Sequence, residues 1–183
     1  MIKPVYVYGS PVLRKVSAEI ASDYPKLKEL IGDMFETMSN SDGIGLAAPQ
    51  IGIPIRLFVI DASPLEEDHP ELKDFKKVFI NPKIVERSEN QVLYNEGCLS
   101  IPNLREDVER PDSITIKYLD ENFNVYEDHF DGVAARVIQH EYDHLEGILF
   151  TDRVSPIRRQ ILKSKLNAIT KGKFSAAYKV KIA

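Results

Sequence analysis

The most constraining feature of the sequence is the run His-Glu-Tyr-Asp-His at residues 140–144, which matches the pattern H-E-x-x-H. Residues four apart lie on the same face of a helix, so His140 and His144 can bind one metal ion. Glu141 follows the first of them and can take a proton from a water on that ion. The flanking residues are largely apolar, which predicts a buried helix whose polar groups need partners such as a metal.

A catalytic site of this kind needs a third protein ligand and keeps a fourth position open. Two known continuations of the motif are absent. The metzincin pattern needs a histidine at the position of Phe150, and the thermolysin-like pattern needs a glutamate some twenty or more residues downstream, whereas no acidic residue follows position 152. The third ligand must then lie upstream, and the candidates are Cys98, His69, His129 or a carboxylate. Cys98 is favoured because Gly97 lets the backbone approach closely and a thiolate binds divalent metals tightly.

A third segment, residues 43–50 with the sequence GIGLAAPQ, is rich in glycine and alanine. Small side chains leave room for another chain to come close, and exposed backbone groups could pair with an extended peptide. The sequence therefore predicts a peptide-binding edge here.

The rest of the chain predicts an α+β fold of one domain. Its 183 residues can bury a sizeable core, and its single cysteine excludes an intrachain disulfide. Hydrophobic periodicity predicts helices over about 25–39, 133–145 and 156–171, and strands at 55–60, 78–80, 84–87, 113–119 and 124–130, with a closing strand within 176–182. Residues 62–76 are expected to form a surface loop. We expect mixed or antiparallel short strands packed around a central metal-binding helix, with residues 1–155 as the catalytic domain and 156–183 packed on it.

The net charge of −4 conceals an uneven distribution. Residues 153–183 hold nine basic and no acidic residues, whereas the preceding chain is strongly acidic. The N-terminus lacks the apolar run of a signal peptide, and no stretch approaches the roughly 18 apolar residues of a membrane span. We therefore expect a cytoplasmic protein without a membrane partner.

Together the three segments resemble the peptide deformylase family, whose motifs are G-Φ-G-Φ-A-A-x-Q, E-G-C-Φ-S and Q-H-E-x-D-H-Φ-x-G, where Φ is apolar. They correspond here to residues 43–50, 96–100 and 139–147, with every fixed position met. The resemblance implies an enzyme that hydrolyses the formyl group from the N-terminal formyl-methionine of nascent bacterial polypeptides and releases formate.

The same resemblance implies the roles of individual residues. The implied metal ligands are Cys98, His140 and His144, holding one divalent ion, Fe²⁺ in the cell, with Zn²⁺, Ni²⁺ or Co²⁺ also able to occupy the site. The implied catalytic groups are Glu141, Gln50 and the backbone N–H of Leu99. The implied substrate-binding residues are Ile44, Gly45, Glu96, Gly97, Arg105, Val133 and Val137. Glu96 is also implied to pair with Arg110, and the basic C-terminal segment suggests a ribosome contact.

Two other functions compete with this interpretation. One is a metallopeptidase that cuts internal peptide bonds, and the other is a non-catalytic binding module stabilised by a metal. The absence of a downstream ligand weighs against the first, and a requirement for Glu141 in turnover would exclude the second.

Overall fold

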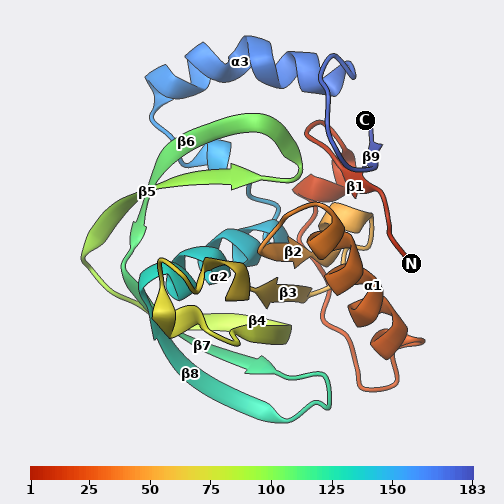
Figure 1. The fold of residues 1–183 in the computed structure, drawn as a ribbon, viewed down its shortest axis with the longest axis vertical. Helices are drawn as coiled ribbons and strands as arrows, with labels where there is room; N and C mark the ends of the chain where they lie inside the picture. Colours follow the sequence, from red (N-terminus) through yellow and green to blue (C-terminus); the bar gives the residue numbers. More distant parts are fainter.

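The computed structural model describes residues 1–183 and contains three α-helices and three sheets (Figure 1). The helices are α1 (Leu27–Asn40), α2 (Gly132–Leu145) and α3 (Pro156–Thr170). The strands are β1 (Val5–Tyr6), β2 (Gly45–Ala47), β3 (Leu57–Asp61), β4 (Lys76–Arg87), β5 (Gln91–Cys98), β6 (Ile101–Pro111), β7 (Ser113–Leu119), β8 (Val125–Asp131) and β9 (Val180–Lys181). Short 3₁₀ turns join several of them.

The main sheet has the order β2-β3-β4-β7-β8 and is antiparallel throughout. Its second strand, β3, is buried on both faces, and its side chains alternate between two cores. Phe58 and Ile60 pack with α2, whereas Leu57 and Val59 pack with α1. The alternation of a β-strand therefore places the two helices on opposite faces of one sheet.

Helix α2 lies between the main sheet and the β5–β6 hairpin (Figure 1). Its end is fixed by Gly147, whose φ of +73° and close approach to the backbone of Arg14 leave no room for a side chain. Above the hairpin, α3 buries Leu162, Leu166 and Ile169 against apolar residues of β6. The chain thus wraps α2 on two sides, which is the position predicted for the metal-binding helix.

The α+β fold and the predicted helices are confirmed, with boundaries that shift by at most two residues. Three details of the strands differ from the prediction. The two strands expected around position 81 form one strand, β4, whose register with β7 shifts between Ile80 and Lys83 and again between Ile84 and Glu86. Residues 91–111, for which no strands were expected, form the β5–β6 hairpin, and the closing strand is only two residues long. No helix in the structure is both long and apolar enough to cross a membrane.

We predict that Phe79→Ala lowers the free energy of unfolding by about 3–5 kcal/mol, as is usual for an aromatic residue lost from a core. Phe79 is 0% exposed and stacks on Phe58 with ring centroids 4.6 Å apart. Urea unfolding followed by circular dichroism measures the change. Val125→Ala, at a position 77% exposed in the same sheet, is the control and should change stability by less than about 0.5 kcal/mol. An equal effect of the two substitutions would contradict this account of the core.

Candidate metal centre

Three side chains from two elements meet beside the β5–β6 hairpin. His140 and His144 lie one turn apart on α2, and Cys98 ends β5 just before the tight connection to β6. One donor atom from each residue lies within 4.8 Å of the other two. The Cys98 Sγ–His144 Nε2 distance is 3.4 Å. The structure therefore brings together the three residues that the resemblance implied as ligands.

This donor set fits a divalent transition metal. Typical metal–sulfur and metal–nitrogen bonds of about 2.3 and 2.05 Å at a tetrahedral angle place the two ligand atoms about 3.6 Å apart. The observed 3.4 Å is close to that separation. Burial lowers the pKa of His144 and favours the neutral imidazole that a metal ligand must present, whereas hydrogen bonds with Cys98 and Glu96 outweigh burial at His140 and raise its pKa. A metal ion at this position would have to displace the proton of His140. The other two histidines considered as ligands lie elsewhere, because His69 contacts Glu71 and His129 contacts Thr115.

Glu141 lies beside the centre in a tightly enclosed position. A Cβ added at Gly45 would lie 2.6 Å from Glu141 Oε1, so only glycine there leaves room for this carboxylate. Glu141 Oε2 is buried and has no hydrogen-bond partner within the protein. Burial raises the pKa of Glu141 to about 7, which suits a group that must both accept and return a proton.

Glu96 orients the first histidine and is itself held by arginines. Its Oε1 lies 2.8 Å from His140 Nδ1, which leaves Nε2 of that ring free to bind an ion. Arg110 donates two hydrogen bonds to the Glu96 carboxylate, and Arg136 donates a third at 2.7 Å. Burial opposes the charge on Glu96, but hydrogen bonds from His140 and Arg110 outweigh it and hold the pKa well below its usual range. Glu96 therefore remains an anion in the interior.

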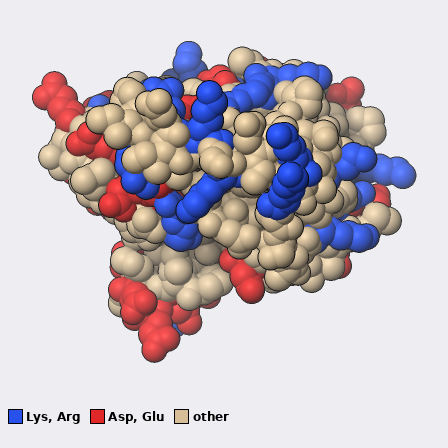
Figure 2. Space-filling model, turned by 90° about the horizontal axis from the view of Figure 1, so that it is seen from above, with Lys and Arg blue, Asp and Glu red and all other residues tan.

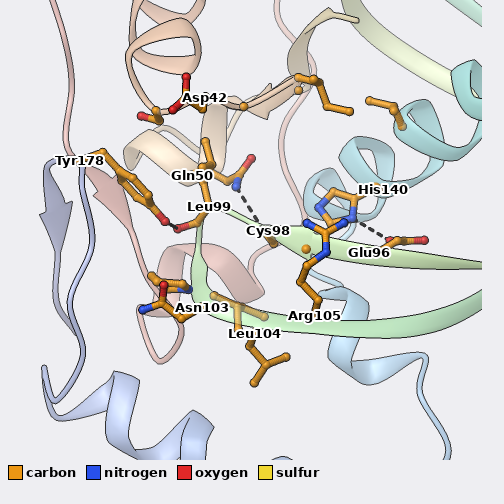
Figure 3. A pocket seen from close by; sticks show the side chains of 18 of the residues that line it. Asp42, Gln50, Glu96, Cys98, Leu99, Asn103, Leu104, Arg105, His140 and Tyr178 are labelled. Atoms are coloured by element: carbon orange, nitrogen blue, oxygen red, sulfur yellow. Dashed lines mark hydrogen bonds and ion pairs between the residues drawn. The ribbon is translucent and has the colours of Figure 1, made fainter. Parts of the chain in front are cut away.

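Gln50 and Leu99 border the centre on the other side (Figure 3). The Gln50 side chain is held at both ends, because its Oε1 accepts from the Ala47 N–H at 2.9 Å and its Nε2 donates to Ser100 Oγ at 3.1 Å. Nε2 also lies 3.5 Å from Cys98 Sγ. The amide is thus fixed with its donors toward the metal ligands.

A cavity of about 950 Å³ opens over the centre, and Glu141, Gln50, Cys98 and His140 all line it. It is also lined by most of the implied substrate-binding residues, namely Ile44, Gly45, Glu96, Gly97, Arg105 and Val137. Val133 is the exception, because it is buried in the core between α2 and the main sheet and does not reach the cavity. Arg105 is exposed at the rim and bonds to Asn95, while its guanidinium covers Gly97.

Sequence reasoning missed two parts of the site. Arg136 is buried and bound to Glu96, although nothing in its neighbours along the chain indicates a partner 40 residues away. The C-terminal residues Ser175–Tyr178 line the cavity beside Leu99, whereas the sequence predicted only that this part of the chain packs on the catalytic domain. Local signals cannot reveal either contact, since both depend on the tertiary fold. The predicted pair of Glu96 and Arg110 is present.

Comparisons with known proteins agree with this geometry. The sequence profile of the polypeptide deformylase family matches residues 2–160. The peptide deformylase of Flavobacterium johnsoniae is 52% identical over 190 residues, which cover 100% of this chain and 97% of the relative. The peptide deformylase of Christiangramia forsetii is 51% identical over 99% of this chain and 96% of the relative. Among solved structures, a peptide deformylase from Plasmodium falciparum matches with a TM-score of 0.82 at 38% identity, covering 92% of this chain and 95% of the other. The peptide deformylase from Thermotoga maritima matches with a TM-score of 0.77 at 40% identity, covering 85% of this chain and 99% of the other. This chain belongs to the polypeptide deformylase family.

Proposed function

We propose that the chain removes the formyl group from the N-terminal formyl-methionine of nascent polypeptides by metal-dependent hydrolysis, with formate and a free amine as products. The observation that carries the proposal is a buried, unpaired carboxylate, Glu141, placed beside a Cys-His-His triad at the base of a cavity. This combination is suited to activating water against an amide.

Each residue of the site has a separate role in the proposed hydrolysis. A divalent ion bound by Cys98, His140 and His144 would polarise the formyl oxygen and lower the pKa of a water from about 15.7 toward 7. Glu141 takes the proton from the attacking water and later delivers it to the departing amine nitrogen. The Gln50 side-chain amide and the Leu99 N–H donate to the formyl oxygen as it gains negative charge, and one such donor is typically worth about 10²–10³ in rate.

The edge of the main sheet provides a place for the peptide. β2 is an edge strand, so one side of it is unpaired. The Ile44 carbonyl accepts a hydrogen bond from the Asp61 N–H and therefore points toward β3. Successive residues of a strand direct their backbone groups to opposite sides, so the N–H and C=O of Gly45 point to the unpaired side of β2. An extended substrate can add to this edge at Gly45. The methionine side chain would then pack against the apolar Ile44 and Val137 in the cavity.

We further propose that one Fe²⁺ ion per chain is the metal in the cell. A set of one thiolate and two imidazoles suits Fe²⁺ as well as Zn²⁺, Ni²⁺ and Co²⁺, so the availability of each metal decides which ion is bound.

We also propose that the protein acts in the cytoplasm, where nascent chains emerge. Residues 1–155 form the catalytic domain, and residues 156–183 pack on it. Burial of Leu166 and Ile169 in the core shared with β6 supports that packing.

The basic C-terminal helix supports a contact with the ribosome. Figure 2 shows Lys and Arg gathered on the face that α3 forms. The buried side of α3 carries Leu162, Leu166 and Ile169. Arg159 and Lys163 are exposed, whereas Arg158 is paired with Glu106. We propose that this face binds ribosomal RNA phosphates, which attract clustered lysine and arginine without regard to sequence.

We predict that Glu141→Gln reduces formate release from formyl-Met-Ala-Ser by at least about 10²-fold, since the amide cannot carry the proton. Metal content should remain at the wild-type level, because Glu141 is not a proposed ligand. Glu109→Gln, which changes an exposed glutamate on β6, is the matched control and should retain full activity. Near-normal turnover by Glu141→Gln would show that the proposed mechanism is wrong.

Metal analysis of protein purified without oxygen should give about one Fe²⁺ per chain, and a chelator should abolish formate release until a divalent ion is restored. His144→Ala should lose the metal, because it removes one of three ligands. His129→Ala, at a surface position on β8, should keep it. Full activity of metal-free protein would exclude metal-dependent hydrolysis.

Charge reversal on α3 tests the ribosome contact without removing the tail. The double variant Arg159→Glu and Lys163→Glu should lose co-sedimentation with ribosomes at low salt while keeping formate release from a free tripeptide. The control Lys28→Glu and Lys83→Glu reverses two exposed charges on α1 and β4 and should co-sediment normally. Absence of binding by the unaltered protein, or equal binding by both double variants, would contradict the proposal.

A further inference from the structure

The C-terminal segment beyond α3, residues 173–183, returns to the body of the protein. Strand β9 pairs in parallel with β1, and Figure 1 shows these two short strands side by side. Its Lys179 and Lys181 carbonyls accept the Val5 and Val7 N–H groups at 3.0 and 3.1 Å. The side chains of Phe174 and Val180 pack against the core beneath α3. The segment is therefore anchored along its length.

Between α3 and β9, Ser175–Tyr178 forms part of the wall of the catalytic cavity. The Ser175 carbonyl accepts a hydrogen bond of 2.7 Å from Asn103 Nδ2, and the Tyr178 hydroxyl donates one of 2.6 Å to the Leu99 carbonyl. In Figure 3 the Tyr178 side chain points at Leu99, opposite the side from which Gln50 approaches. The tail is thus bonded to the connection that follows Cys98.

Leu99 and Ser100 alone connect β5 to β6, so their backbone conformation fixes where the Leu99 N–H points. Ser100 is held by Gln50 on its hydroxyl and by the Tyr8 N–H on its carbonyl. The Leu99 carbonyl is held by Tyr178. The Leu99 N–H and the Leu99 carbonyl lie in the two peptide planes that meet at the Leu99 Cα. A carbonyl held in place therefore limits the changes in φ and ψ of Leu99 by which that N–H could turn.

We propose that Tyr178 is a positioning residue, which acts through its hydrogen bond to the Leu99 carbonyl to keep the Leu99 N–H directed at the formyl oxygen of the substrate. This inference rests on the proposed function of the site. Burial, with a smaller contribution from Cys98, raises the pKa of Tyr178 to about 12, so the hydroxyl stays protonated and able to donate.

The test compares Tyr178→Phe with wild-type protein, because phenylalanine keeps the ring and removes only the donor. We expect kcat for formyl-Met-Ala-Ser to fall about 3- to 10-fold, the range for loss of one hydrogen bond, while KM and metal content each change less than about twofold. Tyr126→Phe is the control, since it removes a hydroxyl bonded to Asp120 in the remote β7–β8 hairpin. Its kcat should equal that of wild type.

The kcat of each variant is expressed per folded, metal-loaded chain, with the melting temperature and metal content measured on the same sample. A kcat of Tyr178→Phe within twofold of wild type would overturn the proposal. A decrease in kcat that is fully explained by lost metal or by unfolding would also overturn it, because Tyr178 would then have a purely structural role. Failure of both wild type and Tyr126→Phe to release formate would instead refute the proposed function.

Discussion

The buried carboxylate of Glu96 is the interaction on which the site depends. It joins β5, β6 and α2, because it accepts hydrogen bonds from Arg110 on β6 and Arg136 on α2 and lies 2.8 Å from His140 Nδ1. An unpaired charge in the interior is costly, and removal of one partner from a buried ion pair usually destabilises a protein by about 3–5 kcal/mol. The same group therefore holds the hairpin against the helix and turns His140 toward its proposed ion.

This network extends beyond the ligands. Arg110 also binds Asp143, which lies on α2 between the two histidines and is held in turn by Arg153 just beyond the helix. The polar residues of the H-E-x-x-H helix thus serve two purposes. His140, Glu141 and His144 face the cavity or the metal centre, whereas Asp143 fixes the helix to its surroundings.

The sequence allowed the site to be predicted better than the hairpin that carries it. Ligand spacing on a helix is local, so His140 and His144 could be paired from the sequence alone. The absence of a downstream ligand then favoured Cys98 as the third ligand, and the family motifs agreed. Strand β6 was missed because its inward positions include Glu106 and Arg110, which interrupt the apolar alternation that indicates a strand. Both charges are neutralised by residues distant in sequence, Arg158 and Glu96. Pairing of this kind, like the contact of Tyr178 with Leu99, exists only in the folded chain.

The most direct test of the account is a product analysis of metal-loaded protein with formyl-Met-Ala-Ser and with the same peptide lacking the formyl group. The account predicts equal amounts of formate and intact Met-Ala-Ser from the first peptide and no reaction of the second. Cleavage of an internal peptide bond in either peptide, or no formate from protein with a full metal complement, would contradict it.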